Sequence, residues 1–137
     1  MPTNEFVTDT EPAPTADLPE TVVSQLTQIT RSIVRIYKDH FGRGPRHAHS
    51  HYAGSDIIIC VLEGTLTPVE QTLVRLGEVK EMQNLRQLFQ AATEETFRST
   101  VEEIIGRKVV SFMSANDVQS DVASEIFVFE RRPARVE

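Results

Sequence analysis

Three histidines lie at alternate positions in the segment that follows Gly44 and Pro45. They are His47, His49 and His51. Because alternate side chains of an extended strand project to one face, we expect the three imidazoles to lie side by side. Two imidazoles so spaced can bind one metal ion, and a third with a carboxylate or a water completes a zinc-like shell. The segment therefore predicts a site for a divalent metal such as zinc, with a solvent-facing polar strand as the alternative.

The same region carries positive charge that could bind an anion. Arg35 and Lys38 lie in a helical pattern, and Arg43 and Arg46 follow it, with the backbone amides of the turn 42–45 between them. Glycine-rich turns of this kind bind phosphate or carboxylate groups. The sequence has neither a phosphate-loop pattern nor a dinucleotide-binding glycine pattern, which argues against a nucleotide ligand. Since interleaved aromatic residues are also lacking, we expect no nucleic-acid partner.

Side chains suited to covalent catalysis are sparse. Cys60 lies among apolar neighbours, where a thiol usually serves as inert packing. The chain has no nucleophile elbow of the Gly-x-Ser-x-Gly type. The acidic pairs at 94–95 and 102–103 fit the wet side of a helix better than an acid and base pair. We therefore expect a protein without enzymatic activity and assign no catalytic residue.

Periodicity predicts the elements that position these residues. Apolar residues three or four apart indicate a helix over 21–41, which Gly42 ends. The segments 46–52 and 56–63, separated by a Gly-Ser turn, are typical of a β-hairpin. The hairpin places the histidines on a strand next to a β-branched, apolar one.

A second helical region follows the hairpin. Thr67, Pro68 and Glu70 supply an N-cap hydroxyl, a proline at the first position and the glutamate of a capping box. A short helix from Val69 is expected, and then a long one from 79 to Gly106. The apolar residues of the long helix should form a stripe along one face. It consists of Met82, Leu85, Phe89, Ala92, Phe97, Val101 and Ile104.

Two further strands complete the predicted fold. Residues 109–113 and 126–129 have strand composition, and the polar segment 114–121 between them is predicted to be a turn. The resulting fold class is α+β, with the order α-ββ-αα-ββ. We expect a four-stranded, mainly antiparallel sheet packed against a long helix.

Length and composition indicate one domain. The chain has 137 residues, of which 39% are hydrophobic and 25% charged. Residues 1–20 hold five acidic residues, four prolines and no lysine or arginine, which predicts a disordered acidic leader. A single domain at 21–131 and a short basic tail at 132–137 are expected to follow it. Removing this leader leaves the domain nearly neutral, although the whole chain has a formal charge of −6.

The cellular location is predicted from what the sequence lacks. Its longest apolar run, 57–62, is far below the roughly 18 residues of a membrane-spanning helix, so no transmembrane segment is expected. No secretory signal is found, and the single cysteine agrees with a reducing compartment. We expect a cytoplasmic protein.

The predicted sheet is apolar on both faces. In the strand 56–63 both alternating sets of side chains are apolar over 57–62, and the strand 126–129 repeats this pattern. A sheet with one wet face should alternate apolar and polar residues, so something must cover the second face. We expect a homodimer that buries this surface. The alternative is a monomer whose first and long helices lie on opposite faces.

The chain resembles the MpsC-like domain family. The resemblance rests on Gly42 to Pro45, Val61 to Glu70, Gly106 to Phe112 and Glu125 to Phe129, and it spans roughly 24–130. The family's name comes from the third component of a bacterial sodium-translocating membrane-potential-generating system whose membrane partners are linked to inorganic-carbon uptake. The resemblance implies no catalytic residues.

Two functions remain open at this point. The resemblance implies an accessory or regulatory domain that contacts a membrane transporter, located in the cytoplasm and peripheral to the inner face of the membrane. The alternative is a small-ligand module that binds a metal ion or an anion in the segment 43–51.

Overall fold

The computed structural model describes residues 18–131, so most of the predicted leader and the predicted tail lie outside the described residues. The element order predicted from the sequence is confirmed. The elements are α3 (Glu20–Phe41), β1 (His47–Tyr52), β2 (Ile57–Glu63), α4 (Pro68–Arg75), α5 (Val79–Ile105), β3 (Val109–Asp117) and β4 (Val122–Phe129).

The four strands form one antiparallel sheet in the order β1-β2-β4-β3. The two apolar strands, β2 and β4, therefore pair at its centre, and the histidine strand is an edge. The predicted turn at 114–121 is wrong, because β3 continues to Asp117 and pairs with β4 up to Val122. Polar residues are tolerated at the end of an edge strand that meets solvent, so composition alone misplaced the turn. The chain reverses at 118–121, where Asp121 has a φ of 57°.

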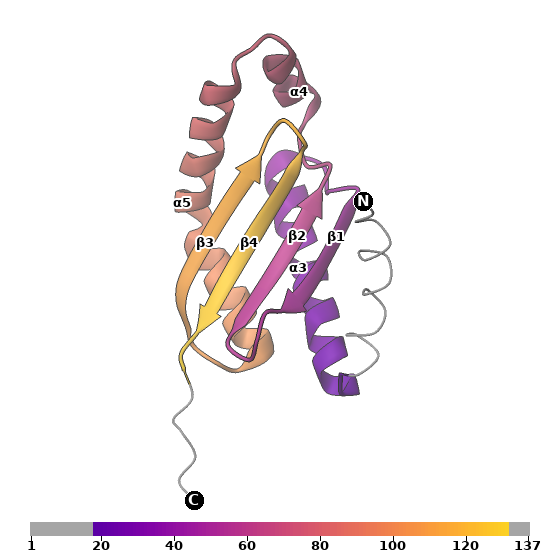
Figure 1. Cartoon of the computed structure of the whole chain (residues 1–137), viewed down its shortest axis with the longest axis vertical. Helices are drawn as coiled ribbons and strands as arrows, with labels where there is room; N and C mark the ends of the chain where they lie inside the picture. Colours follow the sequence, from indigo (N-terminus) through magenta and orange to yellow (C-terminus); the bar gives the residue numbers. More distant parts are fainter. Residues whose placement is uncertain (1–17, 132–137) are drawn as a thin grey trace, which may run out of the picture.

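Both long helices lie on the same face of the sheet. Figure 1 shows α3 and α5 side by side behind the strands. The expected alternative of helices on opposite faces is therefore wrong. One core joins the helices to the inward side chains of the sheet. Its residues that are at most 2% exposed include Ile29, Ile33, Ile58, Cys60, Leu62, Phe97, Val101, Val109, Phe127 and Phe129.

A carboxyl group lies inside this core. Glu125 of β4 is 2% exposed, and its Oε2 accepts a 2.5 Å hydrogen bond from the Tyr37 hydroxyl of α3. Its Oε1 is buried and has no hydrogen-bond partner among residues 18–131. Burial raises the pKa of Glu125 to about 7. The thiol of Cys60 is also buried, which raises its pKa to about 12, and its predicted place in the packing is confirmed.

The buried carboxyl makes stability depend on pH. The folded state binds the Glu125 proton more tightly than the unfolded chain does, where the pKa is the ordinary 4.5. The protonated carboxyl therefore stabilises the fold fully below pH 4.5, and this stabilisation is lost as the pH rises to about 7. The full loss is about 3 kcal/mol, at about 1.4 kcal/mol per pKa unit. Urea unfolding at about pH 5 and about pH 8 should show that Glu125→Gln, which stays neutral, loses less stability than the native chain. Equal losses in the two proteins would contradict this assignment.

Candidate functional site

The start of α4 follows the predicted capping box. The Thr67 Oγ1 accepts a hydrogen bond from the Glu70 backbone amide at 3.3 Å, and the Glu70 Oε1 accepts one from the Thr67 amide at 2.8 Å. Pro68 occupies the first helical position, where no amide hydrogen is needed. The local sequence thus fixes where the helix begins and how the chain enters it.

Glu70 also forms a buried ion pair with α5. Arg86 donates from Nε to Oε2 at 2.9 Å and from Nη2 to Oε1 at 2.5 Å, and also from Nη2 to the Thr65 carbonyl at 3.2 Å. The two residues are 3% and 5% exposed, and the guanidinium lies 4.1 Å from the ring centre of Phe41. Burial alone would raise the pKa of Glu70, but the hydrogen bonds from Arg86 and from the Thr67 amide outweigh it and lower that pKa.

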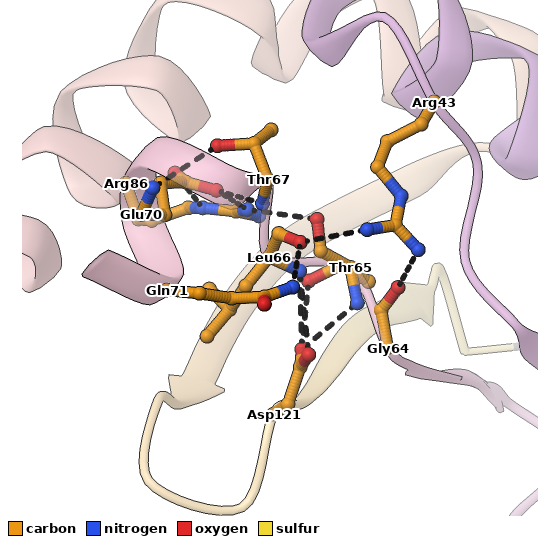
Figure 2. A network of polar contacts seen from close by, with 9 residues as sticks. All are labelled: Arg43, Gly64, Thr65, Leu66, Thr67, Glu70, Gln71, Arg86 and Asp121. Carbon is orange, nitrogen blue, oxygen red and sulfur yellow. Dashed lines mark hydrogen bonds and ion pairs between the residues drawn. The ribbon is translucent and has the colours of Figure 1, made fainter. Parts of the chain in front are cut away.

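Asp121 joins the turn between β3 and β4 to the segment before α4. Its Oδ1 accepts hydrogen bonds from the backbone amides of Thr65 at 2.8 Å and Leu66 at 3.2 Å. Its own carbonyl accepts one from the Gly64 amide at 3.0 Å. Figure 2 shows this carboxylate beneath the segment and the ion pair on the other side of it. The sequence placed Asp121 in a predicted polar turn, but gave no sign that its carboxylate contacts a segment more than fifty residues away.

The four predicted anion-binding residues come from α3 and from the loop that follows it. Arg43 donates to the Leu66 carbonyl at 3.0 Å and the Gly64 carbonyl at 3.4 Å, so it supports the same segment (Figure 2). Arg46 is exposed, and its side chain lies beside Gly64. A Cβ added to Gly64 would lie 3.0 Å from the Arg46 side chain. Arg35 and Lys38 are exposed on α3.

The structure brings two of the three predicted metal ligands together. His49 Nδ1 and His51 Nε2 are 2.7 Å apart on exposed side chains of β1, and His47 is exposed on the same strand. Within residues 18–131, no group of three or more His, Cys, Asp or Glu side chains is placed to hold a metal ion. A groove of about 380 Å³ beside the histidines separates β1 from α3. Its lining includes Thr30, Arg31, Ser50 and both contacting histidines.

The polar network holds a helical protrusion. In Figure 1, α4 and the first part of α5 extend past one end of the sheet. Beneath them lies a second, small core of Leu66, Met82 and Val118. The protrusion exposes large apolar side chains on α4, at its C-cap and on α5. They are Val69 (69% exposed), Leu76 (69%), Leu85 (54%) and Leu88 (67%).

The predicted stripe of α5 needs correction over its first half. Leu85 and Ala92, expected to face the core, are exposed, and Arg86 and Thr93 are buried in their place. The positions 82, 86, 89, 93 and 97 follow regular helical steps, but two of them are polar. Sequence reasoning therefore missed the exposed leucines. Arg86 lies four residues after Met82 and three before Phe89, and this helical spacing was the signal that could have placed Arg86 on the buried face.

Comparison with known proteins identifies the family. The family model for the Na+-translocating membrane potential-generating system (MpsC) matches residues 23–131. The chain belongs to the MpsC family. A relative from Bacillus subtilis (strain 168), "Uncharacterized protein YrhF", is 28% identical over 102 residues, which are 73% of this chain and 83% of that protein. No solved structure matches the chain.

The stretches that carry the MpsC resemblance meet in the polar network. Arg43 lies in the first stretch and Gly64 to Glu70 in the second, and both contribute contacts around the Leu66 carbonyl and the capping box. Arg86 and Asp121, which complete the network, lie outside the four stretches. The structure thus shows that the second stretch supports the protrusion.

Breaking the buried pair of this MpsC chain should loosen the protrusion. Arg86→Met leaves the Glu70 carboxylate buried without its cation, which should cost about 3–5 kcal/mol in the free energy of unfolding. The matched control is Arg75→Met, because Arg75 is exposed on α4 and should cost less than about 0.5 kcal/mol. Urea unfolding measures both. Adding Glu70→Leu to Arg86→Met should recover part of the loss, and equal costs for the two single variants would contradict a structural role of the pair.

Proposed function

We propose that this domain is a non-enzymatic accessory or regulatory protein that contacts a protein component of a membrane transport or bioenergetic system. The observation that carries the proposal is the protrusion with Val69, Leu76, Leu85 and Leu88 exposed. Apolar side chains exposed close together are typical of surfaces that bind other proteins, and these four all lie on the protrusion. The family description supplies the kind of system, a sodium-translocating membrane-potential-generating one.

The protrusion is suited to binding because it is held in place before a partner arrives. Glu70 and Arg86 bond the two helices to each other, and Arg86 also bonds the Thr65 carbonyl at the entry to α4. A surface that is already ordered loses less conformational entropy on association. Leu85 and Leu88 are three residues apart on α5, so one side of the helix presents both to a partner.

The proposed location is the cytoplasm, at the inner face of the membrane. Among residues 18–131, no helix combines the length and the apolar character needed to cross a bilayer. We propose that the partner is an integral membrane component, such as a transporter, and that this chain attaches to it peripherally.

Charge on the exposed leucines should abolish the attachment. In cells that make the protein, the full chain should co-purify with the membrane fraction, and Leu85→Glu with Leu88→Glu should reduce the recovered amount at least tenfold. The matched control is Gln83→Glu with Gln87→Glu, which adds the same charge to exposed residues of the same helix. The control should be recovered like the native chain. Undiminished recovery of the leucine variant, or equal loss in the control, would contradict the proposal.

The second candidate is a module that binds a metal ion or an anion beside β1. The contact between His49 and His51 and the adjacent groove with Arg31 favour it. A pair of imidazoles provides two nitrogen ligands, and water would have to complete the shell.

Zinc titration distinguishes this candidate from the first. If the histidine pair binds zinc, calorimetry with the full chain should give a dissociation constant below about 10 μM, and His49→Gln should weaken it at least tenfold. The control is His40→Gln, since His40 lies at the end of α3 with its Nδ1 near the Ile36 carbonyl at 3.2 Å. Absence of zinc binding, or equal weakening by the control variant, would contradict a metal site at the histidine pair. Neither result would bear on the proposed contact with a protein partner.

A further inference from the structure

The second face of the sheet has a mainly apolar centre, with polar side chains along the β1 edge and at one end. The centre consists of outward side chains of β2 and β4, which are Ile57, Ile59, Val61, Ile126 and Val128, with Met113 of β3 beside them. Met113 is 48% exposed. The histidines line the β1 edge, and Glu63 and Asp117 lie at the row that contains His47.

This face is uncovered in the described part of the chain. The core that contains α3 and α5 includes only the inward residues of the central strands, such as Ile58, Leu62 and Phe127. Figure 1 shows the strands in front and both long helices behind them. The outward isoleucines and valines of the two central strands are half-buried. An apolar surface of this breadth is unfavourable in water.

We propose that a second copy of this chain covers the face, so that two sheets pack against each other. Four strands spaced at about 4.8 Å, with about seven residues rising about 3.4 Å each, give a flat area of roughly 450 Å² per copy. Twice this area, before the relief of the side chains is added, approaches the roughly 1,000 Å² expected of a specific interface. An apolar centre within a polar border is the usual arrangement of such interfaces.

The polar border favours one orientation of the two copies. A two-fold axis parallel to the strands places β1 of one copy over β3 of its partner, and β2 over β4. His47 then lies over Asp117, His51 over Met113 and Ile59 over Ile126, according to the register of the sheet. An axis perpendicular to the strands would instead place the histidine rows over each other. The pairing of the His47 imidazole with the Asp117 carboxylate favours the first arrangement. The sheets cross at roughly 30°, as stacked sheets do.

The interface uses a surface other than the protrusion, so the two proposals are tested separately. Sedimentation equilibrium of the full chain should show a dimer at tens of micromolar. Ile59→Lys should raise the dissociation constant at least 100-fold, because a charge would be buried at the centre of the interface. Ser124→Arg should do the same without removing any apolar side chain, since Ser124 pairs with Val61 and Ala115 on this face.

Two controls keep the result decisive. Leu85→Lys places the same charge on an exposed leucine of α5 and should leave the dimer intact. Circular dichroism and thermal melting should show that Ser124→Arg folds as the native chain does. A monomeric native chain at 100 μM, or a dimer that Leu85→Lys dissociates and Ser124→Arg does not, would overturn the proposal.

Discussion

The antiparallel sheet has apolar side chains on both faces, yet its helices cover only one. Ile58, Cys60 and Leu62 of β2 meet α3 and α5, whereas Ile57, Ile59 and Val61 face away from them. Burial of the first set forms the core and fixes the register of the strands, because a slip of one residue would exchange the two sets. The second set adds nothing to the core of one copy, so its stabilising contribution requires a surface from outside the described domain.

The polar network at one end of the sheet has a different role, because it ties parts of the chain that are distant in sequence to the segment before α4. Asp121 in the turn before β4, Arg43 after α3 and Glu70 in α4 all contact the short segment around Thr65 and Leu66. Arg86 completes the assembly from α5. Because so many of its backbone groups are hydrogen-bonded, this segment is held in one conformation. It leads directly into α4, so it also fixes the position of the protrusion. The domain therefore presents two apolar surfaces, one on the sheet and one on the helices.

The sequence predicted the elements well because their signals are local. Gly42 and Gly106 at the ends of helices and the capping box at Thr67 depend on residues within one turn. The contacts of the network depend on tertiary structure and were not predictable in the same way. The pairing of Glu70 with Arg86 and the long reach of Asp121 link residues that no periodicity connects. Similarly, Arg43 was predicted as an anion ligand because of its positive charge. In the structure its guanidinium donates hydrogen bonds to two backbone carbonyls.

The pairing of two sheets can be observed directly in a mixture of isotope-labelled and unlabelled full-length chains. Within one copy, Met113 on β3 and His51 on β1 are separated by two strands, a distance of roughly 14 Å. An isotope-filtered experiment should detect a nuclear Overhauser effect between the Met113 methyl group of one copy and the His51 ring of the other, together with effects between Ile59 and Ile126 of different copies. Intermolecular effects confined to Leu85 and Leu88, or none at all at a concentration of 100 μM, would contradict this arrangement.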